Sequence, residues 1–195
     1  MAGRGGSASS VSKVCVGLLT GPVGVGKTTV AERVAGLARR RGMICGGLLA
    51  PALKDNRGHK VGVWGADLLT AERRILARTD RDLGGPAVGP YSFDAAALSW
   101  ALGVLENALG ACDLLLVDEM GKLEIERGIG LAPFLPRLSS GEAGRSLVLV
   151  RDYLLEDLQA RLAPVEQTVF VVDEKNRDAL APAIIERLQS PWAAV

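Results

Sequence analysis

The sequence has almost no excess of charge of either sign. Its 195 residues include 23 Lys and Arg against 22 Asp and Glu, for a formal net charge of +1. A broad basic surface for nucleic acid and a long acidic tail both need a charge imbalance that this composition lacks. We therefore expect no nucleic-acid partner, and any electrostatic effect in this protein must be local.

Cysteines and long apolar runs are also scarce. The three cysteines, Cys15, Cys45 and Cys112, are far apart and lack CxxC spacing, which argues against a disulfide framework or a zinc site. Reduced thiols of this kind are typical of a cytoplasmic protein. No apolar run approaches the roughly 20 residues that cross a bilayer, so we expect no membrane partner.

The N-terminal residues contain little that would fold. Residues 1–12 are rich in Gly and Ser and lack the apolar centre of a secretory signal. We predict a disordered leader over 1–12 and a single domain over 13–195. The 48% of hydrophobic residues is enough for one sizeable core.

Short apolar runs alternate with segments of helical spacing along this domain. The apolar runs, predicted as buried strands, cover residues 14–19, 43–50, 113–118, 146–150 and 168–173. Predicted helices follow the first strand up to Gly42, begin after a capping Asp94, and cover residues 131–139, 152–162 and 176–189. This alternation predicts a three-layer α/β fold with a mainly parallel sheet. We predict a small antiparallel addition to this sheet over residues 60–78. An irregular loop is predicted over 84–90.

The stretch GPVGVGKTTV, residues 21–30, completes the phosphate-binding pattern GxxxxGK[ST]. Glycines allow the positive φ angles with which inward-facing amides surround phosphate oxygens, and the following helix directs its positive dipole end at them. We expect Lys27 to reach the β- and γ-phosphates and the Thr28 hydroxyl to bind Mg²⁺. The predicted phosphate-binding residues are Gly21, Pro22, Val23, Gly24, Val25, Gly26, Lys27, Thr28 and Thr29.

Two adjacent carboxylates end the apolar strand in DLLLVDEMG, residues 113–121. The carboxyl ends of parallel strands face the ligand crevice, so Asp118 is predicted to hold Mg²⁺ and Glu119 to activate the attacking water. A glutamate directly after the aspartate is typical of the water-activating division of P-loop NTPases. In that division another strand separates the P-loop strand from the aspartate strand, and we expect 146–150 to be that strand.

Two further candidates follow predicted strands. Arg151 is predicted either to stabilise charge on the γ-phosphate or to pair with Asp152 or Glu156 as a solvated helix-start arginine. Asn176 and Arg177 are predicted to contact the nucleobase or ribose, unless Asn176 only caps the last helix. Lys122 and Glu124 are expected to form a structural ion pair, with a role of either residue in shaping the water site as the alternative.

Several motifs in order make the chain similar to a known family. TGPVGVGKTT, CGGLLAPALKDNRGHKVG, VGPYSFD, LLLVDEMGKLEI and EKNRDAL span about residues 14–185. They resemble the small nucleoside-triphosphatase family first described from thermophiles, which includes cancer-related nucleoside-triphosphatase. DEMGKLEI is close to that family's DEIGKMEL. APALK at 50–54 and VGPYSFD at 88–94 depart from the family's Thr-x-Glu-Val-Arg and VGKYGVD patterns.

The resemblance implies slow, Mg²⁺-dependent hydrolysis of ATP, GTP and other nucleoside triphosphates to the diphosphate and phosphate. Two alternatives remain open at this stage. One is a small-molecule kinase, although the short RLAPVEQ region carries only Arg161 and so no arginine-rich lid. The other is a nucleotide-gated switch that binds a protein partner.

Overall fold

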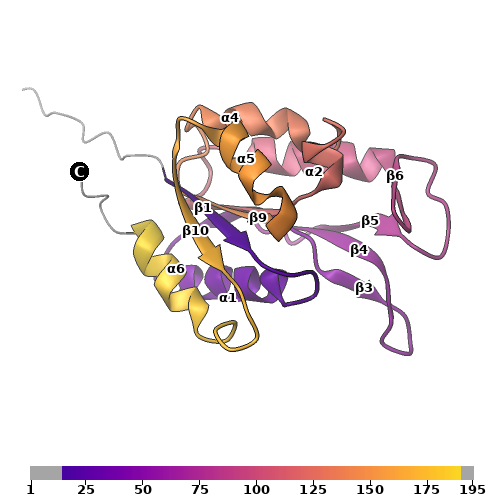
Figure 1. Ribbon diagram of the computed structural model, residues 1–195, viewed down its shortest axis with the longest axis horizontal. Helices are drawn as coiled ribbons and strands as arrows, with labels where there is room; N and C mark the ends of the chain where they lie inside the picture. The colour runs from indigo at the N-terminus through magenta and orange to yellow at the C-terminus, as the bar shows by residue number, and fades with distance from the viewer. Residues whose placement is uncertain (1–14, 190–195) are drawn as a thin grey trace, which may run out of the picture.

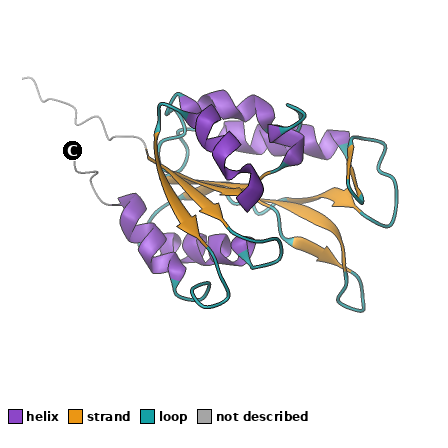
Figure 2. Cartoon of the chain, in the orientation of Figure 1, coloured by secondary structure: helices purple, strands orange, loops and turns teal. Residues whose placement is uncertain are grey.

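The computed structural model describes residues 15–189. The predicted leader at 1–12 and both ends of the predicted domain lie outside the described residues. The described part of the chain forms one mixed sheet between two layers of helices (Figure 1; Figure 2). This agrees with the α/β prediction.

Five parallel strands form the core of the sheet. They are β1 Cys15–Thr20, β2 Cys45–Leu49, β8 Leu114–Met120, β9 Ser146–Val150 and β10 Glu166–Val171. Their order is β10-β1-β9-β8-β2. The predicted insertion of the 146–150 strand between the first strand and the Asp118 strand is confirmed. β1, β2 and β9 are buried along their whole length, which explains why they are continuous apolar runs.

Antiparallel strands extend the sheet beyond β2. They are β3 Ala52–Lys54, β4 Lys60–Asp67, β5 Arg73–Arg78, β6 Ala87–Val88 and β7 Tyr91–Phe93. β4 pairs antiparallel to β2, and β5, β7 and β6 follow in that order. The predicted antiparallel addition is confirmed. The prediction of an irregular loop over 84–90 was wrong in part, because β6 lies within it and forms a hairpin with β7 around Gly89 and Pro90.

Helices cover both faces of the sheet, as Figure 1 shows. The helices of one face are α1 Lys27–Arg40 and α6 Leu180–Gln189. Those of the other are α2 Ala95–Ala108, α4 Leu135–Ser139 and α5 Leu155–Leu162, with short 3-10 turns η1 Ala132–Phe134 and η2 Asp152–Leu154. Each of these two faces has its own apolar cluster.

Local signals fix most helix ends. α1 ends in Arg39 and Arg40 before Gly42 at φ 80, and the Asp94 carboxylate caps α2 by accepting the Ala97 N–H at 2.8 Å. Both features agree with the predictions. The predicted start of the last helix at 176 was wrong, because the Asp173 carboxylate accepts the N–H groups of the next residues and holds them in a turn, so that α6 begins only at Leu180. A four-residue helix, α3 Lys122–Ile125, was not predicted.

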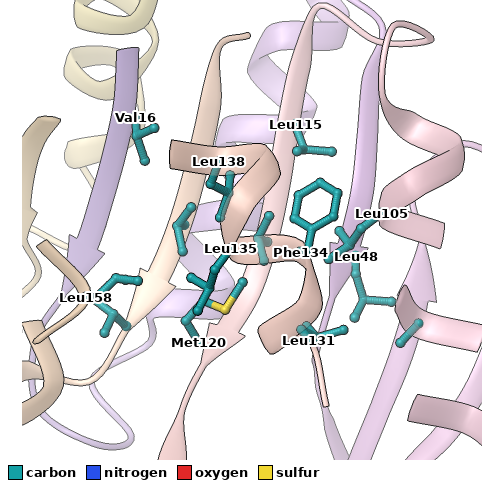
Figure 3. Packing of buried hydrophobic residues seen from close by; sticks show 14 of the residues in the cluster. Val16, Leu48, Leu105, Leu115, Met120, Leu131, Phe134, Leu135, Leu138 and Leu158 are labelled. Carbon is teal, nitrogen blue, oxygen red and sulfur yellow. The ribbon is translucent and has the colours of Figure 1, made fainter. Parts of the chain in front are cut away.

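Apolar side chains of η1 and α4 pack against β8 and hold its C-terminal end in place. Phe134, Leu135 and Leu138 from η1 and α4 belong to the same apolar cluster as Leu115 and Met120 of β8 (Figure 3). Phe134 and Met120 are completely buried. Each such side chain contributes roughly 1.5–3 kcal/mol by leaving water. This packing holds the strand end that carries the two predicted catalytic carboxylates.

Candidate active site at the strand ends

The glycine-rich loop connects β1 directly to α1. Gly21, Gly24 and Gly26 all have positive φ angles, of 144°, 82° and 104°. A Cβ at Gly21 would lie 2.5 Å from the carbonyl oxygen of Val172, and one at Gly26 would lie 2.8 Å from Cδ of Arg177. The loop therefore needs glycine for its backbone conformation and also for its close contact with the segment after β10.

Lys27, the first residue of α1, folds back over this loop. Its ammonium donates to the carbonyl oxygens of Gly21 at 2.7 Å and Pro22 at 3.1 Å. Burial lowers the pKa of Lys27, and the nearby Glu119 carboxylate opposes that shift. The cation thus lies at the mouth of the loop and within the electrostatic reach of the acid at the end of β8.

Asp118 is buried at the end of β8, with 4% of its surface exposed. Burial raises the pKa of Asp118 to about 6, while a hydrogen bond from the Ala50 N–H at 3.0 Å and one from the Thr28 hydroxyl favour its ionised form. The structure thus brings Thr28 and Asp118 together, as the sequence predicted for a shared metal ion.

The side chains of Thr28 and Asp118 together fit Mg²⁺. Within residues 15–189, no three His, Cys, Asp or Glu side chains are grouped to hold a metal by themselves. Mg²⁺ commonly binds one or two protein oxygens and completes its shell with water and substrate phosphates. A hydroxyl and a carboxylate beside a phosphate-binding loop supply such a partial set, and a cation there would offset the cost of the buried Asp118 charge.

Glu119 lies at an irregularity of β8. Asp118 pairs with Leu149 and Met120 with Val150, so Glu119 is an extra residue on its strand. Its side chain is 35% exposed, whereas Asp118 and Met120 are buried. Bulges of this kind are common next to functional sites, and the Glu119 carboxylate here accepts a hydrogen bond from Arg151.

Arg151 follows β9 and donates from Nε to Oε1 of Glu119. Its Nη1 also donates to the Tyr153 hydroxyl at 3.2 Å. Burial lowers the pKa of Arg151, but the hydrogen bond and charge of Glu119, together with Tyr153, raise it above its ordinary value. The sequence left open a pairing of Arg151 with Asp152 or Glu156. In the structure the guanidinium bonds to Glu119 instead.

Asn176 and Arg177 lie in the loop after β10. The Asn176 amide accepts from the Asp173 N–H and donates to the Val171 carbonyl oxygen, so it holds its own loop and does not cap α6. The Arg177 side chain packs against Gly26 of the phosphate-binding loop. Only Arg177 thus lies at the phosphate-binding loop, and the contact of either residue with a base stays a prediction.

Comparisons with known proteins agree with this geometry. The model of the NTPase family matches residues 17–185. The chain belongs to this NTPase family. The family resemblance predicted from the sequence motifs is therefore confirmed, together with the α/β fold.

Two relatives of this NTPase-family chain match it over most of its length. Nucleoside-triphosphatase THEP1 of Thermofilum pendens is 29% identical over 174 residues, which are 89% of this chain and 94% of that protein. THEP1 of Hyperthermus butylicus is 32% identical over 178 residues, 90% of this chain and 92% of that protein.

Two solved structures have the same fold. The solution structure of a human cancer-related nucleoside triphosphatase has a TM-score of 0.67 and 26% identity, covering 90% of this chain and 98% of the other. The crystal structure of THEP1 from Aquifex aeolicus has a TM-score of 0.71 at 18% identity, covering 90% and 99%. At that identity the second structure supports the fold alone.

Glu124 supports the site of this NTPase-family protein in a way that the sequence reasoning missed. Its carboxylate accepts the N–H of Gly121 at 2.9 Å and of Leu131 at 3.1 Å and is 5% exposed. The predicted ion pair with Lys122 was wrong, because Lys122 pairs with Glu126 at 3.6 Å. Glu124 instead connects Gly121, after β8, to Leu131 at the start of η1. In the sequence, only its place in the DEMGKLEI motif pointed to this residue.

Replacing Glu124 with alanine should destabilise the protein by about 2–4 kcal/mol, because the two buried N–H groups lose their acceptor. The free energy of unfolding in urea measures this change. The matched control, Glu126→Ala, removes only an exposed ion pair and should change that free energy by less than about 0.5 kcal/mol. Equal effects of the two substitutions would contradict the assigned role of Glu124.

Proposed function

We propose that this chain hydrolyses nucleoside triphosphates to the diphosphate and phosphate, with Mg²⁺ as its cofactor. The observation that carries the proposal is the meeting of Lys27, Glu119 and Arg151, from three separate elements, beside the glycine-rich loop. Membership of the NTPase family and relatives named nucleoside-triphosphatase support the same reaction class. A P-loop followed by an acid and its cationic partner is suited to phosphoanhydride chemistry.

The loop and Lys27 are assigned to binding the triphosphate. Amides of residues 21–29 would surround the phosphate oxygens at the N-terminus of α1, where the helix dipole favours negative charge. The Lys27 ammonium, now on the Gly21 and Pro22 carbonyls, has enough freedom at the loop mouth to move onto the β- and γ-phosphates. Mg²⁺ held by Thr28 and Asp118 would supply neutralisation of phosphate charge.

Glu119 is assigned to the attacking water. Its carboxylate would accept a proton from water as the oxygen bonds to the γ-phosphorus and the bond to the diphosphate breaks. Arg151 would hold this carboxylate in position and place positive charge near the γ-phosphate. Slow turnover is proposed because the family resemblance implies it.

We propose loose base preference because the two candidate base contacts, Asn176 and Arg177, offer little specificity. The Asn176 amide is occupied by its own loop, and Arg177 offers a guanidinium that can stack on any base. Hydrolysis is favoured over transfer to an acceptor because Arg161 donates to the Ile125 carbonyl at 2.7 Å and so does not form a lid arginine.

We place the protein in the cytoplasm. Cys15, Cys45 and Cys112 are free, and unpaired cysteines are usual in a reducing compartment. None of the helices within residues 15–189 is long and apolar enough to cross a membrane.

The direct test is phosphate release from ATP, GTP, CTP and UTP, each with Mg²⁺ or with an excess of chelator. All four should be hydrolysed at comparable rates, because few groups contact the base, and the chelator should stop the reaction. Absence of release from every nucleotide by folded protein would refute the proposed function. Release that the chelator leaves unchanged would refute the role of Mg²⁺.

Replacing Glu119 with glutamine should lower hydrolysis by about 10²-fold or more while nucleotide binding persists, because the amide cannot accept the proton of water. Phosphate release and calorimetric binding of a triphosphate separate the two effects. Lys27→Ala should weaken both. Glu126→Gln, an exposed change in the same segment, is the control, and hydrolysis by Glu119→Gln equal to that of this control would remove Glu119 as the base.

Replacing Arg151 with alanine should reduce turnover by about 10²-fold with little loss of nucleotide affinity, since its charge acts mainly on the transition state. Arg145 precedes the same strand β9 at its opposite end and is exposed, so Arg145→Ala is the matched control and should keep normal rates. Steady-state kinetics report the split between kcat and KM. A raised KM at unchanged kcat would instead indicate a binding role for Arg151.

A further inference from the structure

A cavity of about 240 Å³ lies beside Glu119, between the end of β8, the antiparallel strands and the start of α2. Leu48, Val63, Leu76, Phe93 and Leu98 contribute apolar walls to it. These residues come from β2, β4, β5, β7 and α2, of which β4 and β5 lie on the right-hand side of Figure 1. The lining also includes Asp118, Glu119 and Arg151 of the candidate active site.

The cavity is far larger than the reaction with water requires. One water molecule needs about 10–15 Å³ of such volume and two to four polar partners. The larger part of the cavity wall is apolar, and its charged side chains are Lys60, Asp118, Glu119, Lys122, Glu124 and Arg151. An apolar cavity of about 150 Å³ is large enough for benzene, whereas sites for drug-sized ligands begin at about 300 Å³. The volume therefore suits a compact organic molecule.

The cavity does not overlap with the phosphate-binding loop. Its lining contains no residue of the loop or of the segment around Asn176 and Arg177. A separate hollow lies at the loop itself and is lined by residues 22–25, Asp173 and Glu174. A molecule in the cavity would thus leave the loop free for phosphates, and the two ligands would meet only at Asp118, Glu119 and Arg151.

The polar groups of the cavity differ in what they can offer a ligand. Glu124 already accepts two backbone N–H groups, one on each oxygen. Asp118 accepts from the Ala50 N–H and faces the metal pair with Thr28. Glu119 has one oxygen on Arg151 and a side chain 35% exposed, so its other oxygen can accept a proton donor from the cavity side. Lys60 lies 5.4 Å from the centre of the Tyr91 ring, which also lines the cavity.

We propose that this cavity is a second binding site, for a compact and mostly apolar molecule that carries a hydroxyl group at one end. The apolar body fills the space between β4, β5 and α2, and the hydroxyl donates to Glu119. This proposal rests on the proposed function in one respect, namely that Glu119 holds the attacking water. The hydroxyl takes the place of that water, so an occupied cavity slows hydrolysis without displacing the nucleotide.

Benzyl alcohol is a suitable probe. Toluene, which lacks the hydroxyl, is the comparison compound. Saturable binding to the nucleotide-free protein is measured by ligand-observed NMR, and phosphate release from ATP is measured in parallel. Both probes should bind. Benzyl alcohol should lower phosphate release at saturation, and toluene should lower it less, because only the alcohol reaches Glu119.

Val63→Phe, which fills the cavity from β4, should weaken binding of benzyl alcohol by about tenfold or more, equivalent to about 1.4 kcal/mol. Leu98→Phe fills it from α2 and provides a second variant. Val61→Phe is the matched control, because Val61 lies on the same strand outside the cavity lining, and it should bind the probe normally. Binding of ADP by each variant confirms that it is folded.

No saturable binding of either probe up to its solubility limit would overturn the proposal, as would equal binding by Val61→Phe and both cavity-filling variants. Equal inhibition by toluene and benzyl alcohol would overturn the contact with Glu119. Protein that hydrolyses ATP but binds neither probe refutes the second site alone. Protein that binds the probes but hydrolyses no nucleotide refutes the proposed function alone.

Discussion

Compensation of buried charge at the ends of β1, β8 and β9 is the constraint on which the site depends. Asp118 is almost fully buried, and Lys27 lies half-buried among the charges of Glu119, Asp152 and Arg151. An unpaired charge in such surroundings costs several kcal/mol, so each of these groups needs an opposite charge or a backbone donor. A triphosphate and a divalent cation, one strongly negative and one positive, can enter this balance without leaving a charge uncompensated.

The strand order makes that compensation possible. β9 lies between β1 and β8. Arg151, which follows β9, therefore reaches Glu119 on β8 and also lies close to the glycine-rich loop that follows β1. The apolar layers on both faces hold these strand ends against movement. The two consecutive carboxylates have different partners, Asp118 with Thr28 and Glu119 with Arg151.

Glu119 lies at the boundary between two spaces of different character. On one side lies the glycine-rich loop, whose walls are mainly backbone, and on the other an apolar cavity of about 240 Å³. The antiparallel strands β4, β5 and β7, which are additions to the parallel sheet, form much of the cavity wall. The same antiparallel strands that lengthen the sheet therefore also shape the space beside Glu119.

Sequence alone determined the features that depend on neighbours along the chain. The phosphate-binding loop, the five apolar strands, the Asp94 cap and the glycine after α1 all follow from patterns a few residues long, since backbone conformation and capping are local. Tertiary structure decided the partners: Arg151 with Glu119, 32 residues apart, and Ala50 with Asp118, 68 residues apart. It also placed Glu124 on two backbone amides and formed the cavity. Such contacts depend on strand order and register, which bring distant residues together only once the apolar layers have packed.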